Sequence, residues 1–485
     1  MRMRWPFGHR QISRHRGVFT VVAAAFVSLG LRAEEGRFHD YAVGARAMGL
    51  GGAFTAIADD PSGVFYNPAG IVDVGRARLS LTTSLYGLEF NGATPVEGVA
   101  QRLGAGLSAA DLIIVPSSTG AAVGLGRPLP GGQRRHAVAF GTLVPSYTSR
   151  LVETELEAVS SGQKTRFRSQ LTDRTLHGGV AYGYRPSQWL RVGIAMHYVL
   201  RTVDAQDDLA TPWGPGVVDS YFMTNSRLRA TQHSARVALG LKGRPGPRWS
   251  LGILLVPPSL GLWRTVDFEA LTVDARTPSQ ASQTRASAEI STADTTSHLP
   301  AMARLGAAFT EPGDYTLSFD LIGYAPSSYT LLEFDEVVGD RADFERIPIP
   351  LRVDRGGLVN GAVGMEKLLS TDVSVSFGLF TNFSSAERLA LKDNGLLLGD
   401  SPRLSNVHMV GGSLAIGLFQ EHSLHRIGIT GSTGFGNVVL PSAPDPDTPG
   451  APPLRAVSAA QSFLYIFWSS SFRYGEGRSS RDLRL

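Results

Sequence analysis

After residue 76, apolar and polar residues alternate with a period of two through much of the chain. In residues 190–201 the even positions are all apolar and the odd positions are mostly small or polar, and residues 315–321 and 373–383 repeat the pattern. Successive side chains of a β-strand point to opposite faces, so the pattern predicts strands with one apolar face. In a membrane β-barrel that face meets lipid, while the polar face lines the lumen.

About fourteen such segments are expected, an even number as in single-chain bacterial barrels. They lie near residues 77–90, 112–126, 135–148, 168–185, 188–203, 227–243, 247–264, 299–311, 314–332, 347–366, 371–385, 404–419, 423–439 and 456–474. Short turns alternate with long polar connections, the longest near residues 91–111, 149–167, 204–226, 265–298, 386–403 and 440–455. Short inner turns and longer outer loops are typical of outer-membrane barrels, so both termini are expected on the periplasmic side.

The alternative is a soluble β-sandwich, in which the apolar faces pack against each other. The N-terminus favours the membrane interpretation. Residues 1–17 carry five Arg and no acidic residue, and an apolar run follows over residues 18–31. A basic region followed by a short apolar region predicts a secretory signal peptide over residues 1–33, with an N-terminal anchor as the alternative.

Charge and cysteine content exclude several classes of protein. The leader holds six of the 46 Lys and Arg and none of the 42 Asp and Glu, so the remaining chain has a net charge of −2. This balance excludes nucleic-acid binding. The chain has no Cys, which excludes a lipoprotein anchor, a disulfide scaffold and a Cys-based metal site. The charged fraction of 18% is also below the ~25% of an average soluble protein.

Residues 34–75, between the leader and the first strand, are predicted to form a plug, or hatch, inside the barrel. This segment is Gly-rich, which allows close backbone approach and positive φ angles. Two Asx-Pro steps predict the starts of short helical turns. Arg46 is expected to pair with Asp59 or Asp60, because a lone charge inside the lumen is costly. The plug residues singled out are Arg46, Gly49, Gly51, Gly52, Asp59, Asp60, Asn67, Pro68 and Ala69.

At this segment the sequence resembles the FadL/TodX family of outer-membrane transporters. In that family an N-terminal hatch with an Asn-Pro-Ala signature plugs a fourteen-stranded barrel. The matching residues are Gly44-Ala45-Arg46-Ala47, Ala58-Asp59-Asp60 and Asn67-Pro68-Ala69. Related PorV-like barrels, which serve protein secretion, carry the same long motif. The resemblance therefore identifies the superfamily and leaves the cargo open.

The resemblance implies passive uptake of hydrophobic compounds, such as long-chain fatty acids or hydrocarbons, by a barrel in the bacterial outer membrane. It also implies release of the ligand sideways through a gap in the wall. A PorV-like role in protein secretion or surface assembly is the alternative. The expected partners are hydrophobic small molecules and outer-membrane lipid, the expected state is a monomer, and no cofactor is expected.

Two prolines mark candidate weak points of the wall. Pro116 and Pro145 lie inside the second and third predicted strands, and proline cannot donate to a ladder. The alternative is that each marks a strand running into a loop. In the last strand, three aromatic side chains share the face expected to line the lumen, namely Phe463, Tyr465 and Phe467. We expect them to contact either a ligand or the plug. A tail over residues 475–485 follows that strand.

No catalytic or metal-binding constellation stands out in the sequence. The histidines are scattered, without metal-ligand spacing. Gly49-Leu50-Gly51 is not a dinucleotide motif, because Phe54 occupies the third-glycine position and no βαβ unit follows. The sequence therefore predicts a non-enzymatic, all-β transmembrane barrel over residues 76–474, plugged by its own N-terminal segment.

Overall fold

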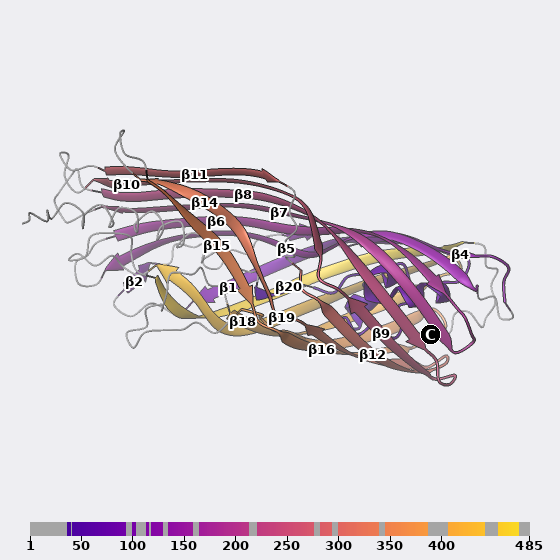
Figure 1. The fold of residues 1–485 in the computed structure, drawn as a ribbon. Helices are drawn as coiled ribbons and strands as arrows, with labels where there is room; N and C mark the ends of the chain where they lie inside the picture. Colours follow the sequence, from indigo (N-terminus) through magenta and orange to yellow (C-terminus); the bar gives the residue numbers. More distant parts are fainter. Residues whose placement is uncertain are drawn as a thin grey trace, which may run out of the picture.

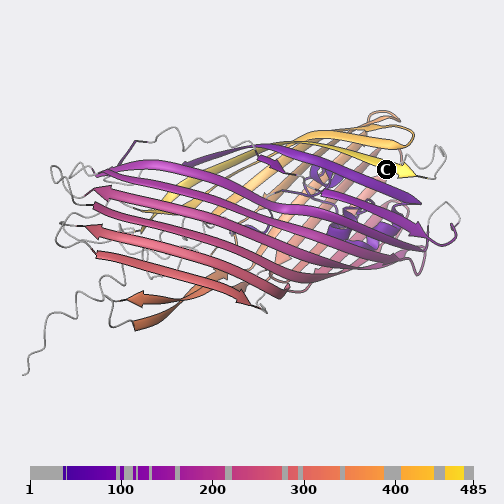
Figure 2. The same cartoon turned by 90° about the horizontal axis from the view of Figure 1, so that it is seen from above.

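The fold is a closed antiparallel β-barrel, as predicted, with fourteen strand positions around the ring. The computed structural model describes residues 36–39, 41–93, 99–102, 113–115, 118–129, 134–158, 164–212, 221–275, 282–292, 299–338, 345–386, 406–441 and 454–474. Figures 1 and 2 show an elongated barrel with short turns at one end, here the turn end, and longer connections at the other, the loop end. The predicted signal peptide and C-terminal tail lie outside the described residues.

The strands follow one another round the ring in chain order. Their bounds are β1 Ala77–Ala93, β2 Val99–Arg102, β3 Ile113–Val115, β4 Ser118–Leu125, β5 His136–Ala158, β6 Lys164–Tyr184, β7 Leu190–Pro212, β8 Tyr221–Gly243, β9 Trp249–Val256, β10 Leu260–Ala275, β11 Ser282–Thr292, β12 Met302–Glu311, β13 Tyr315–Tyr324, β16 Leu358–Leu368, β17 Val373–Asn382, β18 Asn406–Phe419, β19 Ser423–Pro441 and β20 Leu454–Tyr474. The last strand pairs with the first, from Ala77↔Tyr474 to Ala93↔Ala459, which closes the barrel. β14 Ser327–Val338 and β15 Glu345–Arg355 form a separate two-stranded sheet.

The alternation of the sequence becomes an outward apolar face and an inward polar face. In β13 the outward side chains of Leu317 and Phe319 are 42% and 48% exposed, whereas Thr316, Ser318 and Asp320 between them are buried. Along most of their described length the strands pair on both sides, so the apolar side chains can meet lipid without exposing polar backbone. None of the described helices is long and apolar enough to cross a membrane.

Several strands are longer than predicted at the loop end. β7 runs to Pro212 and pairs there with Tyr221 of β8, although residues 204–226 were expected to form a loop. Much of the expected loops 149–167 and 265–298 is likewise strand. The apolar face ends earlier than the backbone ladder, because a strand in water needs paired backbone groups but no apolar side chains. Alternation of apolar residues therefore marks only the part of these strands nearer the turn end.

The N-terminal segment lies inside the barrel at the turn end, seen as the indigo coils in Figures 1 and 2. It contains the short helices α2 Ala45–Gly49 and α3 Gly63–Tyr66 and the 3₁₀ helix η2 Pro68–Asp73. Three apolar clusters between this plug and the wall form the core. Residues 36–75 are hereafter called the plug.

Inward-facing glycines of the wall make room for the plug backbone. A Cβ atom on Gly193 of β7 would fall within 3.0 Å of Ala69 N, and one on Gly378 of β17 would fall equally close to Gly51 N. Gly240, Gly252 and Gly364 face other plug atoms in the same way. Because these glycines come from strands spaced round the ring, the wall fits the plug from several sides at once.

Candidate functional site in the plugged lumen

The Asn-Pro-Ala signature fastens the plug to itself and to the wall. The Asn67 side chain is fully buried, and its Nδ2 donates to Thr55 O at 3.0 Å and to Leu241 O of β8 at 2.9 Å. Its Oδ1 accepts from Ala69 N at 3.1 Å, so Asn67 caps η2 and Pro68 occupies the first helical position. The helical turn predicted from this Asx-Pro step begins where expected.

The Asp60-Pro61 step behaves differently. Asp60 Oδ1 accepts from Ser62 N at 2.8 Å and from Ser62 Oγ at 2.5 Å, and α3 begins only at Gly63. The carboxylate therefore closes an Asx turn ahead of the helix instead of capping it. Just before it, Ala58 has a φ of 38°, a left-handed conformation that costs a non-glycine residue about 1 kcal/mol or more. The surrounding plug packing holds this strained residue in place.

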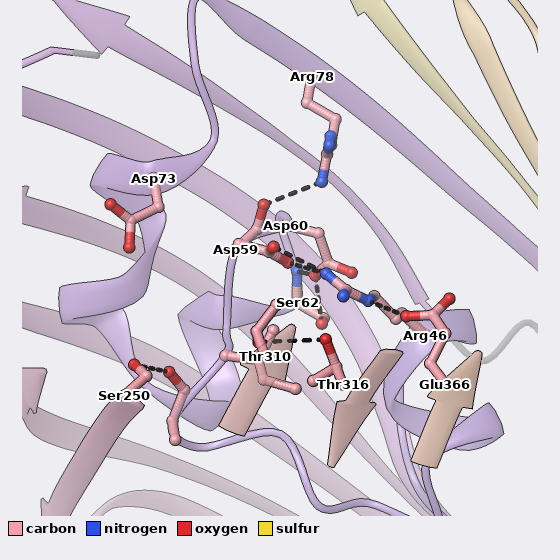
Figure 3. A network of polar contacts seen from close by, with 12 residues as sticks. Arg46, Asp59, Asp60, Ser62, Asp73, Arg78, Ser250, Thr310, Thr316 and Glu366 are labelled. Carbon is pink, nitrogen blue, oxygen red and sulfur yellow. Dashed lines mark hydrogen bonds and ion pairs between the residues drawn. The ribbon is translucent and has the colours of Figure 1, made fainter. Parts of the chain in front are cut away.

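Arg46 connects the plug to the wall through two carboxylates (Figure 3). Its Nη1 lies 2.7 Å from Asp59 Oδ2, and its Nε lies 2.8 Å from Glu366 Oε2 of β16. Glu366 also pairs with Arg426 of β19. Arg46, Asp59, Glu366 and Arg426 are together called the lumen node. Opposite charges alternate along it, so each buried charge has a counter-charge.

The two aspartates of the plug signature have opposite pKa shifts. Burial alone would raise the pKa of Asp59, but the charges of Arg46, Arg78 and Lys242 outweigh it and lower the pKa to about 2. Burial raises the pKa of Asp60, against the hydrogen bonds that Ser62 donates to it. Arg46 thus pairs with Asp59, while Asp60 has a local structural role.

A second group of charges lies at the turn end, where the plug leaves the lumen. Asp73, the last residue of η2, accepts Lys242 Nζ at 2.9 Å, Arg244 Nη2 at 3.2 Å and Arg191 Nε at 3.3 Å, and it also pairs with Arg185. We call these five residues the rim node. Burial opposes ionisation, but the four cations hold the pKa of Asp73 well below its ordinary value.

A cavity of about 70 Å³ remains between the plug and the wall. Its lining comes from the plug and from four wall strands: His39, Tyr41, Ala42, Gly51, Gly52, Phe65, Tyr66, Arg304, Ile322, Tyr324, Asn360, Gly361, Ala362, Phe380, Thr381 and Asn382. Ligand sites for organic molecules usually enclose ~300–1,000 Å³. An alkyl chain therefore requires the plug to shift before it fits.

Arg304 of β12 is the charged residue of this cavity. Its side chain is 4% exposed, and its guanidinium carbon lies 5.0 Å from the ring centroid of Tyr66 and 5.6 Å from that of Phe65. Tyr324 shares a hydrogen bond with it, but Nε and Nη1 have no hydrogen-bond partner. Buried N–H groups of a cation without an acceptor are costly. This arrangement is suited to an anionic group.

The plug residue next to Arg304 does not compete with it for an anion. Burial, followed by the charges of Arg304 and Arg236, lowers the pKa of His39 well below its ordinary value. A neutral imidazole can donate a hydrogen bond but adds no positive charge. Sequence reasoning missed Arg304. The available signal was an Arg at an inward position of a strand whose neighbouring inward residues are Met302 and Gly306.

The three predicted lumen aromatics face inward and pack against the plug. Phe463, Tyr465 and Phe467 are 7%, 3% and 0% exposed. The Tyr41 ring meets the Tyr465 ring edge to face at 5.8 Å, and the Arg37 guanidinium lies 5.3 Å from the centroid of Phe463. Plug packing therefore occupies this wall in the closed barrel.

Of the two prolines expected to weaken the wall, Pro116 lies outside the described residues. Pro145 lies in β5, and the pairing of β5 with β6 shifts register between Leu143 and Ser146. On its other side, the described pairing of β5 with β4 reaches Ser118↔Leu143, and residues 116–117, next along the chain, lie outside the described residues. The ladder is thus irregular between β5 and β6, beside Pro145.

Comparison with known proteins identifies the fold. No family model matches the chain, and no curated protein matches it in sequence. Its structure is similar to a Pseudomonas aeruginosa FadL homologue, with 14% identity, a TM-score of 0.55 and coverage of 90% of this chain and 100% of that one. The P. putida toluene transporter TodX is 11% identical with a TM-score of 0.56, and the Ralstonia pickettii toluene transporter TbuX is 12% identical with a TM-score of 0.53. Both comparisons cover 90% of this chain and 99% of the other protein.

Proposed function

We propose that this protein takes up hydrophobic molecules passively across the bacterial outer membrane. A closed barrel with a lipid-facing apolar exterior, filled by its own N-terminal segment, is not an open pore. Its plug is held at discrete polar points, the signature Asn67 and the two charged nodes, between which it packs through apolar contacts. The same fold occurs in a FadL homologue and in two toluene transporters, which supports this assignment.

Within this class, a long-chain fatty acid is the cargo that the lumen favours over a neutral hydrocarbon. The observation that carries this choice is Arg304, a buried guanidinium beside the cavity with two nitrogens lacking an acceptor. A carboxylate would accept hydrogen bonds from both and neutralise the charge. The rings of Phe65 and Tyr66 beside it would contact the first carbons of the chain.

Release sideways into the membrane is the second part of the proposal. Pro145 supplies no N–H to the ladder, and the pairing of β5 with β6 shifts register beside it. A ligand leaving there would enter the bilayer without crossing the polar turn end. This path keeps an apolar molecule out of water throughout.

Uptake assays with Arg304→Gln test the cargo assignment. In proteoliposomes, the variant is expected to take up oleate about tenfold more slowly, because a charge-assisted hydrogen bond to the carboxylate is lost. Toluene uptake is expected to stay unchanged. The variant's melting temperature should rise, because the substitution removes a buried cation whose Nε and Nη1 have no acceptor. The matched control is Arg236→Gln, another buried lumen arginine, which donates to Pro300 O at 2.7 Å and does not line the cavity.

Equal oleate uptake by Arg304→Gln and wild type would contradict the fatty-acid assignment, and toluene uptake alone would indicate a hydrocarbon cargo. If the wild-type protein moved neither compound, uptake itself would be the wrong function. Loss of surface proteins from a deletion strain would then identify the PorV-like role in secretion.

Replacing Pro145 with Val tests lateral release. Valine restores an N–H and has a high preference for strands, so the ladder is expected to close and oleate uptake to fall about twofold. The measurement is the initial rate of uptake in proteoliposomes, with Val144→Ile, the neighbouring residue, as the control. An unchanged rate in Pro145→Val would remove this break from the release path.

A further inference from the structure

The ladder between β16 and β17 contains a second interruption. Backbone pairing runs from Leu368↔Ser374 to Ala362↔Phe380 and stops there. Contact resumes where Gly356 N donates to Ser385 O at 2.7 Å, next to the bridge Arg355↔Ala386. Between these points lie residues 357–361 on one side and 381–384 on the other, which we call the window.

Side chains bridge the window in place of the backbone. Gly361 N donates to Thr381 Oγ1 at 2.9 Å, and Phe383 N donates to Asn360 Oδ1 at 2.9 Å. The Thr381 hydroxyl also donates to Asn360 Oδ1 at 3.3 Å. Rotation about a side-chain bond can open such a contact, whereas opening a ladder requires two strands to separate. The window is therefore closed by contacts that open at low cost.

Two hollow spaces meet at the window. The inner one is the lumen cavity beside Arg304, and the outer one is a groove of about 820 Å³ on the lipid-facing surface. Gly361, Ala362, Phe380 and Thr381 line both. At this point a single layer of wall residues therefore separates the cavity from the groove.

The outer groove is apolar and has glycines where its neighbours carry large side chains. Val363, Leu379 and Val410 stand at its sides and are 51%, 52% and 53% exposed. Gly412, the register partner of Leu379, and Gly431, the next partner along, also line the groove and leave the depression. Its volume lies in the ~300–1,000 Å³ range of sites that hold organic ligands. An alkyl chain matches both its size and its chemistry.

The first residues of the plug close the window from inside. Asn382 Nδ2 donates to His39 O at 2.6 Å, and Ser385 donates to Gly36 O through N at 2.5 Å and through Oγ at 2.9 Å. These contacts join the moving part of the proposed transporter to the edge of the window. A shift of this end of the plug would free the side chains that bridge the gap.

We propose that the window is a lateral opening in its own right, through which the alkyl chain of the cargo passes from the lumen cavity to the lipid-facing groove while its anionic group stays at Arg304. The proposal rests on the uptake function proposed above. The groove is assigned to the cargo chain, and not to bilayer lipid, because its inner end meets the cavity that holds the cationic side chain. This opening is separate from the ladder break at Pro145: among the described residues, none that lines the cavity belongs to β5.

A thiol lock tests the opening. The chain has no Cys, so Asn360→Cys with Thr381→Cys places the only two thiols across the window, where dibromobimane can join them. The matched control is Met365→Cys with Phe377→Cys, register partners in the intact part of the same ladder. Locking the window is expected to lower oleate uptake by proteoliposomes about twofold, because the separate exit beside Pro145 stays open, and locking the control pair to leave it unchanged.

Equal uptake before and after a verified window cross-link would overturn the proposal while leaving the uptake function standing. Absence of oleate uptake in the unlinked protein would instead overturn the uptake function, and the opening with it. The two failures are thus distinguishable in one experiment.

A single-label experiment avoids the need for a cross-link. Bimane on Leu379→Cys reports from the groove, and bimane on Phe377→Cys reports from the same lipid-facing side of β17 outside it. Dibromostearate is expected to quench the Leu379 label saturably and the Phe377 label only in proportion to its concentration in the bilayer. Arg304→Gln should abolish the saturable part. Identical curves for both labels would show that the groove holds bilayer lipid only and would overturn the assignment.

Discussion

The rim node and the lumen node both hold the plug by charge, but they are built differently. At the rim, one plug carboxylate, Asp73, meets four cations of the wall. In the lumen, Arg46 lies between Asp59 of the plug and Glu366 of the wall, and Glu366 meets a further cation. The rim depends on a single residue, whereas the lumen node shares its charges among several.

This difference indicates which end of the plug is fixed and which end can move. The side chains of Lys242 and Arg191 are only 1% and 2% exposed. Without Asp73 both cations would stay buried and would lose the carboxylate that they share. Arg46 keeps one carboxylate if it releases the other. The structure thus favours a plug anchored at the rim and displaced near the lumen node, close to the cavity.

The largest expected effect is that of Asp73→Asn. It removes the one negative charge of the rim node and should weaken plug docking by about 3–5 kcal/mol, as for breaking a buried ion pair from one side. Protease cleavage of the plug, with the barrel followed by circular dichroism, measures the change. Arg244→Gln is the control, because Arg244 is 38% exposed and leaves three cations on Asp73. If both variants resist protease like the wild type, the rim is not the anchor.

A smaller effect is expected for Asp59→Asn. Arg46 and Arg426 both keep Glu366 as their counter-charge. The Asp59 side chain is 29% exposed and the asparagine oxygen still accepts one hydrogen bond, so the cost should be about 1–3 kcal/mol. The same protease assay compares the two nodes directly. A loss as large as that of Asp73→Asn would show that the nodes share the load equally and would remove the distinction between fixed and mobile ends.

The smallest expected effect near neutral pH is that of acid. As the pH falls, the lumen node should be released before the rim node. Asp59 has a lowered pKa of about 2 against an ordinary 3.8, so the unfolded plug binds more protons between these values. Its stabilisation is complete above about pH 4 and is lost as the pH falls towards 2. The pKa of Asp73 is lower still, so the rim persists further into acid. Plug accessibility followed from pH 5 to 2, in wild type and Asp59→Asn, measures this; coincident curves would contradict it.

Local patterns predicted much of the plug and the wall. Asn67 and Pro68 are adjacent, and Arg46 and Asp59 lie within one short segment, so their contacts required no knowledge of the barrel. Alternation located the lipid-facing part of the strands. It did not reveal their polar extensions such as residues 204–212, because ladder pairing depends on the neighbouring strand and not on side-chain polarity.

Contacts between distant segments were beyond local patterns. Arg304 is far in sequence from Phe65. The four cations around Asp73 come from two strands, β7 and β8, and from the turns that follow β6 and β8. The window depends on where the pairing of β16 with β17 ends, which is set by the register of both strands and by the plug pressed against them. No short motif records such a register.

The sequence by itself determined a strand-rich barrel with an apolar exterior and a Gly-rich plug, because alternation, turn residues and caps act over a few neighbouring positions. Only the tertiary structure decided which charges hold the plug, where a buried cation meets a cavity and where the wall is thin. Those features arise when closure of the ring brings together side chains that are hundreds of residues apart, and their energies depend on burial that no local pattern reveals.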